Sequence, residues 1–138
     1  MASDIAITVT ERHGRRCAGS GSRWEPIMGY SRAVRSGNVI AVTGTVGVNA
    51  DGSYAGSLAE QTARALAIIR AALEALGGRI EHVIRTRMFV TDVARWEEVA
   101  VVHGRVFGDI RPATTIVEVA RLIDVDARIE IEADAIVP

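Results

Sequence analysis

Hydrophobic and polar positions predict two helices. Apolar residues recur every three or four positions over residues 58–76, which is the period of a helix with one buried face. Its predicted inward stripe consists of Leu58, Thr62, Ala65, Leu66, Ile69, Leu73 and Leu76. Gly77-Gly78 is typical of a left-handed helix end. Thr91 or Asp92 can cap a second helix over residues 93–107. The predicted inward stripe of this helix is Trp96, Val99, Ala100, His103 and Phe107.

Strand-like segments lie before, between and after these helices. They are residues 5–9, 31–35, 39–43, 83–91, 114–120 and 128–137. Ser36-Gly37-Asn38 predicts a hairpin between the second and third segments, and the Gly/Ser-rich residues 19–26 predict a loop. A chain of 138 residues without repeats or linkers predicts a single domain over residues 1–138.

The predicted strands have one apolar and one charged face. Residues assigned to the face under the helices are Ile84, Thr86, Met88, Val90, Ile129, Ile131, Ala133 and Ala135. Residues assigned to the opposite face are Arg85, Arg87, Phe89, Thr114, Ile116, Glu118, Glu130, Glu132 and Asp134. This second face is either a solvated surface with weak ion pairs or the lining of a subunit interface or cleft.

Composition argues against several classes of function. The chain is 49% hydrophobic and 24% charged, and its net charge of −1 lacks the basic excess of a nucleic-acid binder. The aromatic fraction of 4% is too small for base-stacking platforms. All 16 basic residues are arginine, which excludes a lysine Schiff base and a P-loop lysine.

The sequence also predicts a compartment. Cys17 is the only cysteine, so the chain forms no internal disulfide. Residues 1–17 contain no uninterrupted apolar run, and we expect no signal peptide. No apolar stretch approaches the roughly 20 residues that a membrane span needs. We therefore expect a cytoplasmic protein with no membrane or nucleic-acid partner, and the isolated His13 and His82 predict no metal site.

Five segments together resemble the RidA/YjgF family. They are YSRAVRSG at 30–37, RTRMFVTD at 85–92, RPATT at 111–115, VEVARL at 117–122 and RIEIEA at 128–133. The resemblance covers residues 30–137, in the family's order. It implies a chorismate-mutase-like α+β fold, in which a mixed sheet carries two helices on one face. It also implies a homotrimer with clefts for a small-molecule metabolite between subunits.

The resemblance further implies a chemistry. Members of the founding subfamily hydrolyse reactive enamines and imines such as 2-aminoacrylate, without a cofactor or metal. An arginine binds the substrate carboxylate in a bidentate pair, and a glutamate positions the attacking water. Glu130 corresponds to this catalytic glutamate, Tyr30 to a pocket tyrosine, and Thr43-Gly44 to a Ser-Gly pair whose backbone faces the ligand.

The chain departs from the family at the arginine. The family's arginine follows a Pro-Ala pair, and here Pro112-Ala113 is followed by Thr114, which binds a carboxylate far more weakly. This argues against 2-aminoacrylate as the substrate. Arg111 is a candidate replacement. Trp24 is a candidate wall of the ligand site or a subunit contact, and we interpret His103 as a packing residue.

Three functions stay open, and the sequence alone does not decide whether the protein is an enzyme. The first, which we favour, is hydrolysis of an imine or enamine metabolite other than 2-aminoacrylate. The second is non-catalytic binding of a small metabolite in the same cleft. The third is the ribonuclease or translation-inhibitor activity with which the family is also labelled. The charge, the scarce aromatics and the absence of a Ser/His or paired-His motif speak against this third function.

Overall fold

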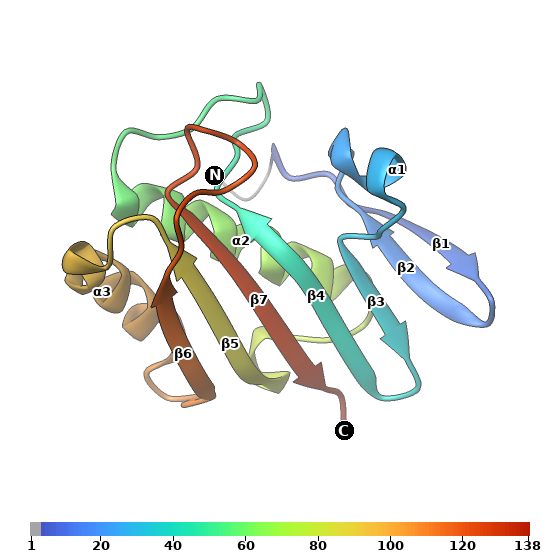
Figure 1. The fold of residues 1–138 in the computed structure, drawn as a ribbon. Helices are drawn as coiled ribbons and strands as arrows, with labels where there is room; N and C mark the ends of the chain where they lie inside the picture. The colour runs from blue at the N-terminus through green and yellow to red at the C-terminus, as the bar shows by residue number, and fades with distance from the viewer. Residues whose placement is uncertain (1–3) are drawn as a thin grey trace.

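The computed structural model describes residues 4–138, which form one mixed sheet with helices on one face (Figure 1). Within this range the sheet has seven strands in the order β1-β2-β3-β4-β7-β5-β6. The strands are β1 (Thr8–Arg12), β2 (Arg15–Gly19), β3 (Ala33–Ser36), β4 (Val39–Val46), β5 (Val83–Val90), β6 (Ala113–Glu118) and β7 (Ile129–Ile136). Neighbouring strands are antiparallel except β5 and β6, which are parallel. The predicted α+β fold, a mixed sheet with two helices on one face, is therefore confirmed. The predicted single domain also includes residues 1–3, which lie outside the described residues.

Two longer helices pack together on the same face of the sheet. They are α2 (Leu58–Ala75) and α3 (Trp96–Phe107), and α2 crosses behind the strands in Figure 1. The short α1 (Trp24–Met28) lies beside β2, and η2 (Ile80–His82) and η3 (Val93–Arg95) are 3₁₀ turns. Ser57 caps α2, because its Oγ accepts the Glu60 N–H at 3.0 Å. Gly77 follows the helix with a left-handed φ of 80°, as predicted.

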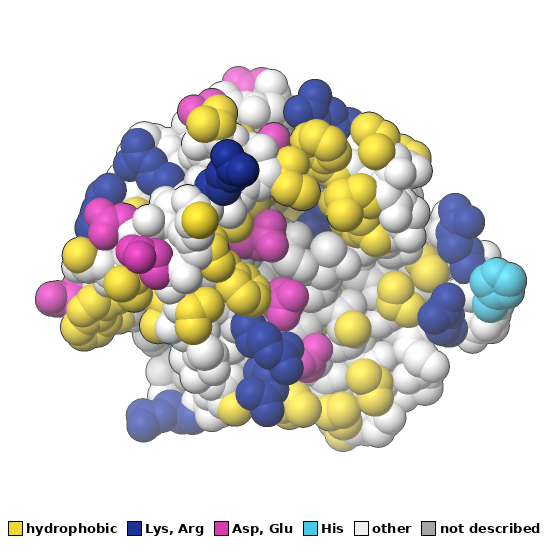
Figure 2. All heavy atoms as spheres, in the orientation of Figure 1, with side chains coloured by type: hydrophobic (Ala, Val, Ile, Leu, Met, Phe, Trp, Pro, Cys, Tyr) yellow, Lys and Arg dark blue, Asp and Glu magenta, His cyan; other side chains and the backbone are white. Residues whose placement is uncertain are grey.

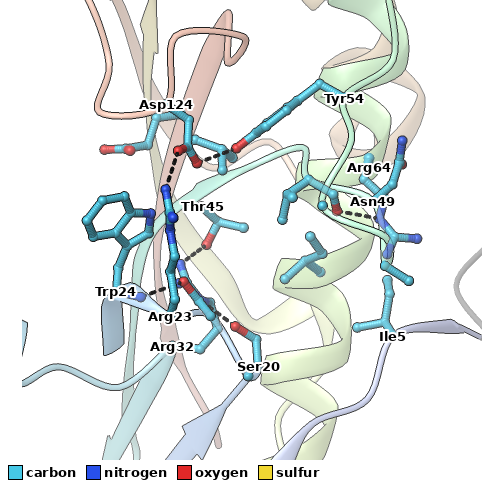
Figure 3. A pocket seen from close by; sticks show the side chains of 18 of the residues that line it. Ile5, Ser20, Arg23, Trp24, Arg32, Thr45, Asn49, Tyr54, Arg64 and Asp124 are labelled. Carbon is cyan, nitrogen blue, oxygen red and sulfur yellow. Dashed lines mark hydrogen bonds and ion pairs between the residues drawn. The ribbon is translucent and has the colours of Figure 1, made fainter. Parts of the chain in front are cut away.

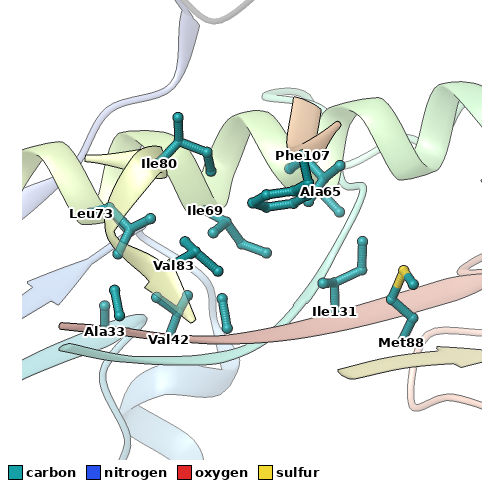
Figure 4. Close-up of a cluster of buried hydrophobic side chains, with 14 of the residues drawn as sticks. Ala33, Val42, Ala65, Ile69, Leu73, Ile80, Val83, Met88, Phe107 and Ile131 are labelled. Atoms are coloured by element: carbon teal, nitrogen blue, oxygen red, sulfur yellow. The ribbon is translucent and has the colours of Figure 1, made fainter. Parts of the chain in front are cut away.

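The core lies between α2 and the sheet (Figure 4). The predicted stripe of α2 is confirmed, since all seven of its residues are buried. From the sheet, alternate residues of β7 face the helix, and these are Ile129, Ile131, Ala133 and Ala135. A fully buried Leu or Ile contributes about 1.5–3 kcal/mol relative to an exposed one, so this layer supports the position of β7 and of the polar residues that alternate with its apolar ones.

The predicted inward stripe of α3 is partly wrong. Val99 and Phe107 are buried, but Val102 is buried where Ala100 was expected, and Trp96 is 49% exposed. The Asp92 carboxylate accepts the Ala94 N–H and caps the 3₁₀ turn η3, so residues 93–95 are not part of the predicted α-helix. The α-helix begins at Trp96, three residues later than predicted, and its first residue lies at the surface.

Part of the predicted charged face is also wrong. In the register of β5 and β6, Ile116 lies beside Met88, and Ile116 packs against the core on the side of the helices. Glu118 lies on the same side, where its Oε1 accepts the Val93 N–H at 3.1 Å. A register shift between Val83 and Arg85 leaves Ile84 52% exposed, although it was predicted to be buried. The face that carries no helices therefore has the three carboxylates of β7.

The N-terminal region differs from the prediction as well. Residues 5–9 were predicted as a strand, and the strand observed is β1, which forms a hairpin with the unpredicted β2. All residues of β1 are exposed, so the strand has no alternation of buried and exposed positions to mark it. The predicted loop at residues 19–26 contains the first turn of α1. Across residues 4–138, none of the helices combines the length and apolar character of a membrane span.

Candidate functional site

A cavity of about 620 Å³ lies at the end of β4 (Figure 3). Its walls come from the N-terminal segment, the start of α1, the end of β4 with the loop that follows, one face of α2, and the segment before β7. Four residues proposed from the sequence line this cavity: Trp24, Tyr30, Gly44 and Glu130. The fold thus brings them together from positions up to 106 residues apart in the chain (130 − 24).

Glu130 is the carboxylate at the base of the site. It lies on β7 between Val46 of β4 and Phe89 of β5. A Cβ at Gly44 would lie 2.6 Å from Glu130 Oε2, so the carboxylate sits directly over the Gly44 backbone. Burial raises the pKa of the Glu130 carboxyl, the charge of Glu132 adds to this rise, and the Arg32 guanidinium opposes it. Among residues 4–138, Glu130 has no hydrogen-bond or ion-pair partner.

Arg32, which the sequence did not single out, lies buried beside the same cavity. Its Nη1 donates to the Gly44 carbonyl at 2.8 Å and to Thr45 Oγ1 at 3.3 Å. Its Nε donates to Ser20 Oγ at 3.2 Å, and its Nη2 donates to the Tyr30 hydroxyl at 3.4 Å. The guanidinium is therefore occupied by acceptors of the protein itself, and it fixes the positions of Tyr30 and Gly44.

Glu25 links α1 to this arginine. Glu25 Oε2 lies 3.5 Å from Arg32 Nη2, and it accepts the Ser20 hydroxyl at 2.6 Å. Both charged side chains are nearly buried, at 7% exposure for Arg32 and 11% for Glu25. Removal of one partner of a buried ion pair strongly lowers the stability of the protein, because the other charge is left buried without a counterion. The pair holds α1 in place, and with it the adjacent Trp24 at the cavity wall.

A chain of polar contacts crosses the rim of the cavity (Figure 3). The Tyr54 hydroxyl donates to Asp124 Oδ2 at 2.7 Å, and Arg23 Nη2 lies 3.9 Å from Asp124 Oδ1. The Arg23 guanidinium also lies over the Trp24 ring, 4.5 Å from its centroid. Burial raises the pKa of Tyr54, and the hydrogen bond to Asp124 and nearby negative charges add to this effect. These contacts join three segments that are distant in the sequence.

Three of the proposed site residues lie elsewhere. The Thr43 side chain donates to the Ser31 carbonyl at 2.6 Å, and Thr43 does not line the described cavity. Thr114 contacts the Thr86 hydroxyl and lies 3.3 Å from His103 Nε2, on the side of the sheet that faces the helices. Arg111 is exposed before β6, with a left-handed φ of 59°. Within this chain, neither Thr114 nor Arg111 reaches the cavity.

His103 has the contacts of a packing residue. Its Nε2 lies 2.9 Å from Thr86 Oγ1, and its ring centroid is 4.6 Å from that of Phe107. Burial lowers the pKa of His103, because the charged imidazolium loses hydration there. Within residues 4–138, no group of three or more His, Cys, Asp or Glu residues is arranged to hold a metal ion.

Comparison with known proteins identifies the family. A family model described as Endoribonuclease L-PSP matches residues 20–137. The chain belongs to the RidA/YjgF family. Among solved structures of this family, a YjgF/YER057c/UK114 member from Mycobacterium tuberculosis has 46% sequence identity and a TM-score of 0.83, covering 89% of this chain and 99% of that one.

Two further RidA/YjgF relatives are informative. An uncharacterized protein of Streptomyces coelicolor is 35% identical over 117 residues, or 84% of this chain and 87% of the relative. A protein of Dermatophagoides farinae named 2-iminobutanoate/2-iminopropanoate deaminase is 28% identical over 115 residues, or 82% of this chain and 89% of the relative. The similarity thus extends along most of each chain.

Arg32, Tyr54 and Asp124 are the site residues that sequence reasoning missed. One signal was present for Arg32, because it lies two positions after Tyr30 and such positions share a face in an extended chain. The contact between Tyr54 and Asp124 joins residues 70 positions apart, and no local pattern marks it.

Proposed function

We propose that the protein hydrolyses a reactive imine or enamine other than 2-aminoacrylate, and that Glu130 moves the protons. The observation that carries this proposal is the Glu130 carboxyl, which is half-buried in the cavity and has no partner within residues 4–138. Its raised pKa makes the protonated form easier to reach than in an exposed carboxylate, which suits a group that must both accept and donate a proton. The deaminase name of the Dermatophagoides farinae relative supports the same reaction class.

The proposed reaction needs few groups. Water attacks the imine carbon, and the Glu130 carboxylate accepts a proton from that water. The protonated carboxyl then returns this proton to the nitrogen, which gives a carbinolamine. Glu130 next moves the hydroxyl proton of the carbinolamine to the nitrogen, the carbon–nitrogen bond breaks, and a carbonyl compound and ammonia leave. Tyr30 and the Gly44 backbone, both bound by Arg32, form a fixed wall beside the reacting atoms.

Two observations support a substrate other than 2-aminoacrylate. Thr114 occupies the place of the family's arginine, and its hydroxyl is directed toward Thr86 and His103. Arg32 is the buried guanidinium of the cavity, and its donors are already occupied. Among the buried cavity groups, a substrate carboxylate would therefore find no free bidentate partner, and Arg23, the 73% exposed guanidinium at the rim, binds an anion more weakly because water screens its charge.

Binding without turnover is the second candidate function. It is favoured by the size of the cavity and by the missing arginine, since a binding protein needs a pocket but no catalytic clamp. We also propose that the chain assembles as a homotrimer, in which a neighbouring copy extends this site, and that it is a cytoplasmic protein. The model described as Endoribonuclease L-PSP names a nuclease, but the net charge of −1 and the scarce aromatics still speak against RNA as the substrate.

Imine decay decides between hydrolysis and binding. A panel of imines is produced in the cuvette by amino-acid and amine oxidases, and their decay is followed by semicarbazide trapping. We expect the protein to accelerate the decay of at least one imine, and Glu130→Gln to lose most of this acceleration, because general acid–base catalysis contributes about 10²–10⁴-fold.

The matched control is Glu97→Gln, an identical change at an exposed position of α3, which should retain full activity. If added ligands raise the melting temperature but the protein accelerates the decay of no imine, binding without turnover is the function and hydrolysis is contradicted. An unchanged rate in Glu130→Gln would overturn the role of this residue.

A further inference from the structure

We propose that the cavity selects cations, and that the substrate of the proposed hydrolysis is the protonated imine of a primary amine, without a carboxylate. This inference rests on the proposed function, because it names the substrate class of the same site. It starts from the ionisable groups that line the cavity. Four are carboxylates and three are guanidiniums: Asp4, Asp124, Asp126, Glu130, Arg23, Arg32 and Arg64.

Two of the three guanidiniums, those of Arg32 and Arg64, are held by close protein partners. Arg32 is surrounded by acceptors and is ion-paired with Glu25, a further carboxylate behind the cavity wall. Arg64 Nη1 lies 2.6 Å from Asp4 Oδ1, and its Nε donates to the Val48 carbonyl at 3.0 Å. An anionic ligand would have to displace these contacts, so the cavity offers little to a carboxylate.

Arg23 lies at the rim in water, where its charge is screened and attracts an anion only weakly. Its side chain is 73% exposed, and its guanidinium lies over Trp24 and beside Asp124. This contact shows that the Trp24 ring already accepts a cation on its face, at a wall of the cavity. A ligand cation that enters the cavity meets the same kind of surface.

The negative charges of the cavity carboxylates are less fully balanced by nearby guanidiniums. Glu130 and Asp126 form no ion pair among residues 4–138, and the nearest guanidinium to Asp124 is 3.9 Å away. Asp124, Asp126 and Glu130 line the same cavity as Tyr54, whose hydroxyl donates to Asp124 Oδ2 at 2.7 Å. Burial is the main cause of the raised pKa of Tyr54, and the charges of these three carboxylates add to it. The open volume next to Tyr54 is therefore a region of negative potential.

A protonated imine fits this region chemically as well as electrostatically. The positive nitrogen makes the adjacent carbon a better electrophile for water, and the Glu130 carboxylate that attracts the cation also accepts the proton of the water. Overall, the protonated imine and one water give a carbonyl compound and an ammonium ion, and no electrons are exchanged. A two-electron oxidation of a primary amine is the class of reaction that supplies such a substrate.

Two imines that differ by one carboxylate test this inference. A flavin-dependent amine oxidase makes the imine of 2-phenylethylamine, and an amino-acid oxidase makes the imine of phenylalanine. We expect the protein to accelerate decay of the first at least ten-fold more than decay of the second. Asp126→Asn should reduce the acceleration of the amine-derived imine several-fold, whereas Asp109→Asn, an equal change at an exposed position outside the cavity, should not.

A binding measurement separates this inference from the proposed hydrolysis. By calorimetry, 2-phenylethylammonium should bind at least ten-fold more tightly than 3-phenylpropanoate, with an affinity that falls as salt increases. Preferred turnover of the phenylalanine imine, or preferred binding of the propanoate, would overturn the cation preference. The proposed hydrolysis is tested separately, by whether either imine is turned over. Preferred binding of the ammonium without turnover of either imine would support the cation preference and contradict the proposed hydrolysis.

Discussion

Gly44 and Gly47 lie three positions apart around the end of β4, and each lacks a side chain for a different reason. A Cβ at position 44 would meet the carboxylate end of Glu130 at 2.6 Å. A Cβ at position 47 would lie 2.2 Å from the backbone carbonyl oxygen of Gln61, in α2. A carboxylate at the end of a flexible side chain can rotate away, but the backbone of a packed helix has no such freedom.

Alanine at these two positions should therefore separate activity from stability. We expect Gly44→Ala to unfold within about 1 kcal/mol of the wild type, since only a side chain moves, and to lose most imine-hydrolysing activity as Glu130 is displaced. We expect Gly47→Ala to lower the free energy of unfolding by about 3 kcal/mol. Urea unfolding and imine decay measure the two effects. Full activity in Gly44→Ala would contradict the assigned position of the Glu130 carboxylate.

At the scale of elements, the sequence predicts best where one periodicity is long and uninterrupted. The stripe of α2 and the alternation of β7 were both predicted correctly, because each repeats its pattern against one continuous core. The face of β6 was not, because this strand is largely exposed on both sides and its register to β5 decides where Ile116 and Glu118 lie. The start of α3 was wrong for a local reason, the 3₁₀ turn that Asp92 caps.

In the candidate site, too, the residues marked by a local sequence pattern were predicted, and those that depend on three-dimensional packing were not. The resemblance to the family identified Glu130, Tyr30 and Gly44, and the residues themselves suggested Trp24, because these positions have recognisable neighbours in the sequence. The partners of Arg32 come from four separate segments, and a hydrogen-bond network of that kind follows from the packing of β3, β4 and α1. Such a network becomes visible only when the elements are placed in space.

The junction of α3 with β5 and β6 predicts a dependence of stability on pH. His103 is half-buried against Thr86, and burial lowers its pKa in the folded protein below the unfolded value of about 6.5. The unfolded chain therefore binds the proton more readily, and the stability present above that value is lost as the pH falls through the folded pKa.

Urea unfolding between pH 7.5 and pH 5 measures this loss. We expect His103→Gln to show a smaller decrease in the free energy of unfolding over this range than the wild type shows. His13→Asn, at an exposed turn with a left-handed φ of 51°, is the matched control and should keep the wild-type profile. Identical profiles for the wild type and His103→Gln would show that the imidazole at α3 does not contribute.

At the scale of the whole molecule, the face of the sheet opposite the two long helices is not covered by any helix within residues 4–138 of the same chain (Figure 1 and Figure 2). Its residues mix apolar and charged side chains. Ala41 and Val117 are exposed there, whereas Arg87 Nη1 lies 3.5 Å from Glu132 and 3.2 Å from Asp134. Apolar positions among ion pairs that already neutralise one another are better suited to contact with another protein surface than to water.

We predict that this face mediates assembly into a homotrimer, and that sedimentation at micromolar concentration shows a trimer for the wild type. Ala41→Arg introduces a large charged side chain at the centre of the face and should yield smaller species. Ala63→Arg makes the same change on the exposed side of α2 and should remain trimeric. A stable wild-type monomer, or equal behaviour of the two variants, would contradict this interface.

Ligand binding and imine hydrolysis by the dissociated Ala41→Arg variant then show whether the site lies within one chain or needs a neighbouring copy. Glu130, Tyr30, Gly44 and Trp24 all line a cavity formed by one chain, so a folded Ala41→Arg monomer should keep the ability to bind 2-phenylethylammonium. Arg111 lies away from this cavity in its own chain, and in an assembly it is available to a neighbouring copy. If Ala41→Arg and Arg111→Ala both lose imine hydrolysis while binding persists, the cation site belongs to the single chain and the catalytic site to the trimer.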